Sequence, residues 1–239
     1  MLATPGRRVQ SVAEASFDAW VKYYRPDENS PNSTISYYGK GALVALALDL
    51  RLRALGRLSI DDVMRGLWQR SAGGPISETD ILAVVSDCGD VAAAQALSAW
   101  VHGTDDLPLP ALLEAAGVQW RADKATVAQR LGLRVSESAL TGVQVKQVLA
   151  GSAAQAAGFC AADEVVGCND WRLRRLDDVP LSLAAGQSSL RFVVSRDQRL
   201  IELRLDWPPQ DAMPVPVLLS LADAPSQPVR DLRQAWLGA

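Results

Sequence analysis

The sequence changes its periodicity near Trp120, and this change limits the folds open to the chain. Before that point, apolar residues recur at the spacing of helices, with polar breaks between the segments. After it, apolar residues alternate or cluster in short runs separated by glycines, which is typical of short strands. The pattern predicts an α+β protein with a helical part over residues 1–118, a β-rich part over 119–207 and a proline-rich tail over 208–239.

The helical part contains one long apolar segment and several shorter helices. We expect a first helix that carries Phe17, Trp20, Val21 and Tyr24 and ends before Arg25. Further helices are expected over 36–55, 60–70, 78–88 and 90–101, with a short last one that ends at Gly117. The first half of the 36–55 helix is apolar nearly all round, so it is predicted to be buried. Ser59 with Asp62, and Ser77 with Asp80, have the spacing at which a serine and a carboxylate cap a first turn.

The β-rich part contains five candidate strands. They lie at residues 132–138, 142–149, 163–169, 190–195 and 199–207. The last two flank a polar turn at Asp197, which predicts a terminal hairpin. The tail is expected to cross a surface and to end in a short helix around residues 229–236.

Composition and charge exclude two classes of partner. Hydrophobic residues make up 49% of the 239 residues, which is enough for packed cores, and the net charge is −3. Such a chain lacks the excess of positive charge with which proteins bind nucleic acid. The longest apolar run, at residues 41–50, is too short to span a bilayer, and the N-terminus has no signal peptide. We therefore expect a soluble chain without a membrane partner, cytoplasmic as given, whose longer parent could be periplasmic.

Three ordered segments carry a resemblance to a known family. TPGRRVQS at 4–11, SFDAWVKYYRPDENS at 16–30 and SYYGKGALVALALDL at 36–50 resemble consecutive segments of the glycyl aminopeptidase family. The similarity extends over about residues 4–68. Members of that family are thermolysin-like zinc enzymes that remove N-terminal residues from peptides. The resemblance implies that this chain is the C-terminal portion of such an enzyme.

Tyr38 is the candidate catalytic residue that the resemblance implies. Tyr38-Gly39-Lys40-Gly41 is similar to a YxKG element in which the tyrosine hydroxyl donates to the oxyanion of the tetrahedral intermediate. A phenol with a pKa of about 10 stays protonated at neutral pH and suits this task. Tyr37 remains an alternative if the register differs by one residue. The residues alone leave open whether Lys40 holds a carboxylate or the helix start, or is a packing or surface cation.

The chain lacks the residues for the metal site of that family. An HExxH zinc site needs two histidines one helical turn apart, and the sequence contains one histidine, His102. Its three cysteines have no CxxC spacing. We therefore expect no metal site and no cofactor in this chain, and no activity from it alone. The resemblance implies that zinc and its ligands belong to a missing N-terminal catalytic half, which would be a partner of this chain.

The β-rich part resembles a PDZ domain. In the segment 145–170, Gly151 and Ser152 match a turn before a helix, and Asp163 and Asn169 match the strand that follows. PDZ domains add an extended peptide to an open sheet edge and bind its terminal carboxylate with loop amides. The resemblance implies a peptide C-terminus or peptide substrate as ligand, and a PDZ fold with an empty or covered groove is the alternative. The implied peptide-binding residues are Leu131, Gly132 and Leu133 in the loop, with Arg134 and Val135 in the strand.

Two further readings remain open beside the peptidase portion. The chain could be a non-catalytic peptide-binding module, or a structural fragment. A helical unit that belongs to a larger catalytic domain should expose an apolar face and a tyrosine without a partner, because the covering half is missing. A self-sufficient unit should seal that face with its own residues.

Overall fold

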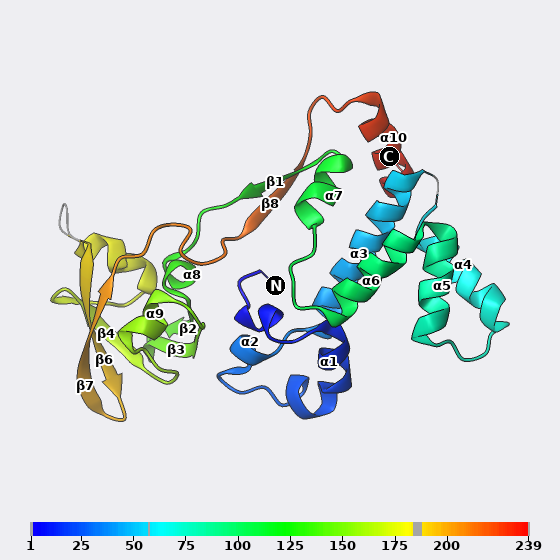
Figure 1. Cartoon of the computed structure of the whole chain (residues 1–239). Helices are drawn as coiled ribbons and strands as arrows, with labels where there is room; N and C mark the ends of the chain where they lie inside the picture. The colour runs from blue at the N-terminus through cyan, green and yellow to red at the C-terminus, as the bar shows by residue number, and fades with distance from the viewer. Residues whose placement is uncertain (1, 57, 184–187, 239) are drawn as a thin grey trace.

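A computed structural model describes residues 2–56, 58–183 and 188–238. It contains a helical unit and a sheet unit, joined by the two-stranded ribbon of β1 (Val118–Ala122) and β8 (Val217–Leu221) (Figure 1). The elements of the helical unit are η1 (Pro5–Arg8), α1 (Val12–Phe17), η2 (Ala19–Tyr23), α2 (Ser30–Ser33), α3 (Tyr37–Leu55), α4 (Ile60–Ser71), α5 (Glu78–Cys88), α6 (Val91–His102), α7 (Leu109–Ala115) and α10 (Gln227–Leu237).

The helical unit is built around α3. This helix packs against α1, α4, α6, α7 and α10, and its second half supplies much of the buried core. Leu50 and Leu52 are each 1% exposed. The C-terminal half of α3 is thus the more completely buried half.

The first half of α3 is less buried than its composition predicted. Tyr38, Gly39 and Ala42 are exposed, whereas Lys40 and Val44 are buried. The prediction of complete burial is therefore wrong for one face. The physical reason is that no described part of the chain lies over that face.

Local capping signals are confirmed. Ser59 with Asp62 forms a capping box at α4, and Ser77 with Asp80 forms one at α5. Asp90 accepts from the backbone N–H of Ala93 at 2.6 Å and caps α6. These bonds satisfy first-turn amides from within a few residues, which is why the sequence alone indicated where the helices begin.

The predicted first helix is interrupted. Instead of one helix that continues from Phe17 to Tyr24, α1 ends at Phe17 and a π-helical turn, η2, follows. A π turn adds a residue to the helical ring and so changes which side chains share a face. As a consequence, Tyr23 and Tyr24 both reach the start of α3.

The sheet unit is an antiparallel sheet with two short helices and a 3-10 segment. Its strand order is β2-β3-β4-β6-β7, and β5 pairs with β4. All five predicted strands are present. The elements are α8 (Val127–Leu131), β2 (Leu133–Ser138), β3 (Gly142–Val148), α9 (Ala153–Ala157), β4 (Glu164–Cys168), β5 (Trp171–Arg172), η3 (Leu176–Ser182), β6 (Ser189–Arg196) and β7 (Arg199–Asp206).

The predicted terminal hairpin is confirmed. Arg196 pairs with Arg199, and the two residues between them have φ of +49° at Asp197 and +66° at Gln198. Two consecutive positive φ values are those of a type I′ turn, whose twist matches paired strands. Arg196 also donates to the fully buried carboxylate of Asp163 at 2.7 and 2.8 Å, so this hairpin is anchored to the loop before β4.

The tail departs from its prediction. Rather than only crossing a surface, it forms β8 (Val217–Leu221), which pairs antiparallel with β1 (Val118–Ala122). The expected short helix is present as α10, and Leu232 and Trp236 pack against the helical core. The tail therefore returns from the sheet unit to the helical unit, as Figure 1 shows.

Asn32 connects the two units directly. Its side-chain amide donates to the carbonyl of Val148 at 2.9 Å, and its side-chain oxygen accepts from the N–H of Ala150 at 2.8 Å. An asparagine side chain can satisfy a backbone donor and a backbone acceptor at once in this manner. The end of β3 is thereby held against α2.

Replacing Asn32 with alanine should weaken this connection. Two hydrogen bonds are lost, so the free energy of unfolding should fall by about 1–2 kcal/mol, and hydrogen exchange at the Ala150 amide should become faster. Urea unfolding and amide exchange measure the two effects. Ser33→Ala is the matched control, because Ser33 is exposed and its neighbourhood is the same. Equal exchange at Ala150 in both variants would contradict the role given to Asn32.

Candidate functional site

Tyr38 lies in the first turn of α3 and is 61% exposed. Ser36 precedes the helix, and its hydroxyl accepts from the N–H of Gly39 at 3.1 Å. Ile35, which is 3% exposed, anchors the chain just before this cap. The helix start is therefore fixed by a buried residue and a cap, while the ring of Tyr38 remains accessible.

All four tyrosines of the chain gather around this helix start. The rings of Tyr37 and Tyr38 lie 4.2 Å apart between centroids, and that of Tyr23 lies 5.3 Å from both Tyr24 and Tyr37. The Tyr24 hydroxyl is 3.1 Å from that of Tyr37 and 3.3 Å from that of Tyr38. We call these four residues the tyrosine cluster.

The hydroxyls of the tyrosine cluster differ in acidity. The hydrogen bond with Tyr24 is the main cause that lowers the pKa of Tyr38 below its usual value of 10, and the neighbouring Tyr37 hydroxyl acts in the same direction. The hydrogen bond with Tyr24 is also the main cause that raises the pKa of Tyr37. Of the two candidates, Tyr38 is the better hydrogen-bond donor to a developing negative charge, because a more acidic hydroxyl donates more strongly.

Exposed apolar side chains of α1 and η2 form an apolar face that adjoins the tyrosine cluster through Trp20. Phe17 is 91% exposed, Trp20 is 80% exposed and Val21 is 69% exposed. The ring centroids of Trp20 and Tyr24 lie 5.2 Å apart, so the face continues into the cluster. The structure thus has the exposed face expected of a unit from a larger domain. The expectation of a tyrosine without a partner is wrong, because Tyr24 is hydrogen-bonded to Tyr38.

Lys40 is buried, at 1% exposed. Its ammonium group donates to the carbonyl of Gly103 at 3.3 Å. Burial lowers the pKa of Lys40, and the negative charge of Asp106 acts in the opposite direction. Of the roles left open for Lys40, a surface cation is excluded, and the observed bond joins α3 to the loop after α6.

The described residues contain no group of three or more His, Cys, Asp and Glu side chains that could hold a metal ion. His102 lies at the end of α6, with its Nε2 2.6 Å from Oε1 of Glu78. Both side chains are about half exposed. The one histidine therefore has a neighbouring carboxylate from α5 but no further ligand beside it.

The residues proposed for peptide binding lie together at one end of β2. Leu131 and Leu133 point into the core of the sheet unit and are 0% and 2% exposed. Gly132 follows the last turn of α8 with φ of +77°, and its N–H donates to the carbonyl of Gln129 at 3.1 Å. This amide is thus engaged within the chain and does not face an open anion site.

Arg134 and Val135 belong to β2, which is an edge strand of the sheet. Arg134 donates to Gln147 at 3.0 Å and to Thr4 at 3.2 Å. Within the described residues, the backbone of β2 pairs only with β3. In that part of the chain, the outer edge of β2 pairs with no further strand.

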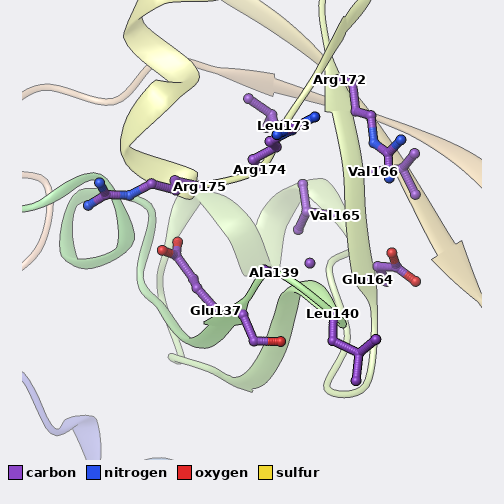
Figure 2. Close-up of a pocket in the computed structure, with 12 residues that line it drawn as sticks. Glu137, Ala139, Leu140, Glu164, Val165, Val166, Arg172, Leu173, Arg174 and Arg175 are labelled. Carbon is purple, nitrogen blue, oxygen red and sulfur yellow. The ribbon is translucent and has the colours of Figure 1, made fainter.

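Sequence reasoning missed a pocket at the far end of β2. It has a volume of about 650 Å³ and lies between the β2–β3 hairpin, β4 and the segment after β5. In Figure 2, Arg175 extends away to the left and Arg172 runs downward on the right, with Val165 between them. Glu137, on its wall, accepts from the N–H of Leu176 at 2.8 Å and so links β2 to η3. Nothing in the linear pattern brings residues 137, 164 and 172–175 together.

Comparisons with known proteins bear on the family. A family model described as M61 glycyl aminopeptidase matches residues 1–44. A crystal structure of an aminopeptidase N family protein from Idiomarina loihiensis is similar over 98% of this chain, with 27% sequence identity and a TM-score of 0.80. The comparisons support a C-terminal portion of an M61 peptidase.

This chain spans 42% of the length of the chain in that crystal structure. The search of curated proteins found no match. No helix among the described residues is long and apolar enough to cross a membrane. The resemblance to the glycyl aminopeptidase family is thus confirmed, with the family model matching residues 1–44, and the comparisons support a peptidase-related protein.

Ser36→Ala should loosen the start of α3. The serine hydroxyl caps Gly39 and lies 3.3 Å from the hydroxyl of Tyr23, so its loss should reduce the free energy of unfolding by about 1 kcal/mol. Ser226→Ala is the matched control, because Ser226 precedes α10 but makes no side-chain cap bond. Thermal or urea unfolding of the two variants checks this. Equal losses would show that the Ser36 cap contributes nothing specific.

Proposed function

We propose that this chain is the C-terminal portion of a zinc metallo-aminopeptidase that hydrolyses N-terminal residues from peptides. Tyr38 is its oxyanion stabiliser. The observation that carries the proposal is the exposed Tyr38 hydroxyl, held in the tyrosine cluster beside an uncovered apolar face. A catalytic donor must be accessible to substrate and fixed in direction, and Tyr38 meets both requirements.

The donor set of this chain does not fit a catalytic zinc ion. Such an ion needs three protein ligands with an open position, and the described residues bring no such group together. The metal and the groups that bind it would therefore come from the partner half. What this chain supplies is the hydroxyl of Tyr38, which donates to the substrate oxygen as the carbonyl becomes tetrahedral.

The apolar face supports the same proposal. Each large apolar side chain gains about 1.5–3 kcal/mol when it is fully removed from water. Most of that stabilisation is absent in this chain, because the side chains of Phe17, Trp20 and Val21 remain exposed to water. A metal-bearing half that covered them would also bring its site next to Tyr38.

The decisive variant is Tyr38→Phe in a form of the protein extended to include the metal-binding half. Loss of one oxyanion donor should lower kcat by about 100- to 1000-fold, with little change in KM. Because the Tyr38 pKa is lowered, the unmodified enzyme should lose activity as pH rises through a value below 10. Measurement of kcat/KM against pH checks both effects.

The matched control for that experiment is Tyr37→Phe, which removes the neighbouring phenol from the same helix turn. A larger loss of activity in Tyr37→Phe than in Tyr38→Phe would transfer the catalytic role to Tyr37. Full activity in both variants would refute an oxyanion role for this helix start.

A second candidate function is peptide binding by a PDZ-like sheet unit without catalysis. It is favoured by the open outer edge of β2, beside which a peptide could add as a further strand. The engaged amide of Gly132 argues that binding relies on this edge more than on capture of a terminal carboxylate.

Titration with an acetylated hexapeptide distinguishes these contributions. Amide NMR signals of Arg134–Ser138 should shift, whereas those of β7, the opposite edge strand, should stay in place. An amidated C-terminus should bind within about threefold of the free acid if the strand edge dominates. Shifts at both edges, or at neither, would count against a specific peptide site.

A further inference from the structure

The proposed oxyanion chemistry gives no role to the hydroxyl of Tyr24, although Tyr24 belongs to the tyrosine cluster. Tyr24 lies between the two helix-start tyrosines, with its oxygen 3.1 Å from that of Tyr37 and 3.3 Å from that of Tyr38. A phenol carries one proton, so Tyr24 can donate to one neighbour and accept from the other. The direction of this short chain of hydrogen bonds decides where the proton of Tyr38 points.

The position of Tyr24 depends on a rare backbone feature. It immediately follows the π-helical turn Ala19–Tyr23, and its N–H donates to the carbonyl of Ala19 at 3.0 Å. Turns of this type are rare and are found frequently at functional sites. Here the turn allows the consecutive residues Tyr23 and Tyr24 to contact the same helix start from one side.

Tyr23 has a different partner from Tyr24. The Tyr23 hydroxyl is 3.3 Å from the Ser36 hydroxyl, and its ring lies edge-on to that of Tyr37. It thus contacts the cap of α3. Tyr24 alone among the four tyrosines has its hydroxyl within hydrogen-bond distance of both Tyr37 and Tyr38 in the described structure.

We propose that Tyr24 is a positioning residue for Tyr38. Tyr37 donates to Tyr24, Tyr24 donates to Tyr38, and the Tyr38 proton is left free to point toward the substrate oxygen. The proposal rests on the proposed oxyanion role of Tyr38 and adds the residue that orients it. Hydrogen bonds in such a chain polarise one another, so each donation strengthens the next.

The acidities of the outer two hydroxyls agree with this order. A hydroxyl that accepts a hydrogen bond has its anionic form stabilised, and the pKa of Tyr38 is lowered chiefly by Tyr24. A hydroxyl that donates loses that bond on ionisation, and the pKa of Tyr37 is raised. The distances establish which hydroxyls are partners, and the two pKa directions favour this order of donation.

A spectroscopic test on this chain needs no catalysis. Labelling tyrosine with ¹³C at Cζ gives four signals, because the sequence contains four tyrosines, and each is assigned by its Tyr→Phe variant. The signal of Tyr38 should titrate below pH 10 in the unmodified chain. In Tyr24→Phe its midpoint should rise toward 10, and the midpoint of Tyr37 should fall toward the same value.

Tyr23→Phe is the matched control for this titration. It removes a hydroxyl from the same turn and the same cluster, yet its partner is Ser36, so the Tyr38 midpoint should not move. Circular dichroism over the same pH range establishes that the chain stays folded. A Tyr38 midpoint that is unchanged by Tyr24→Phe, or that moves equally in Tyr23→Phe, overturns the proposal.

Kinetics in the extended, metal-containing form provide a second readout. Tyr24→Phe should lower kcat by about fivefold with KM unchanged, because only the orientation of a donor is lost. Combined with Tyr38→Phe, it should cause no additional loss. Additive losses would overturn the positioning role. If Tyr38→Phe is fully active, the oxyanion role fails, while the NMR titration still decides whether Tyr24 donates to Tyr38.

Discussion

The bond between the buried ammonium of Lys40 and the carbonyl of Gly103 joins the start of α3 to the loop after α6. A buried cation without a partner is costly, so the loop after α6 has to stay where its carbonyl can accept. That loop also carries Asp106, whose carboxylate accepts from Arg7 at 2.8 Å and from Arg8 at 2.6 Å. The segment before α1, the start of α3 and the end of α6 are thereby fixed relative to one another. Tyr38, two residues before Lys40, is held by the same constraint.

A short stretch of chain links the tyrosine cluster to the edge strand of the sheet unit. Asn32 is bonded to the end of β3, and Ser36 caps α3 a few residues later. The N–H of Leu149, at the same end of β3, donates to the carbonyl of Gly132, where β2 begins. A peptide that extended β2 would thus lie against a sheet whose neighbouring strand is tied to the tyrosine-bearing helix. This continuity gives the sheet unit a physical means of positioning a ligand relative to Tyr38.

The sequence predicted those features that depend on neighbouring residues. Capping boxes at Ser59 and Ser77, and the hairpin turn at Asp197, act over three or four residues and were read correctly. The pairing of β1 with β8 joins residues about a hundred positions apart, so no local sequence pattern predicts it. The π turn was not predicted either, because the contacts that accompany it, those of Tyr24 with Tyr37 and Tyr38, also join residues that are distant in the sequence. Tyr38 itself was identified through the family resemblance, and the hydroxyl that orients it became visible only in three dimensions.

The uncovered face beside the tyrosine cluster determines how strong that orientation is. Tyr24 is 48% exposed in this chain, and water competes for a hydroxyl that it can reach. A partner surface over Phe17, Trp20 and Val21 would remove water from the same region and lower its effective dielectric constant. The hydrogen bonds from Tyr37 to Tyr24 and from Tyr24 to Tyr38 would then strengthen, because electrostatic interactions grow as the dielectric falls. Covering this apolar area with the metal-bearing half would therefore also strengthen the hydrogen bonds that orient Tyr38. Association of the two halves and activation of Tyr38 would occur together.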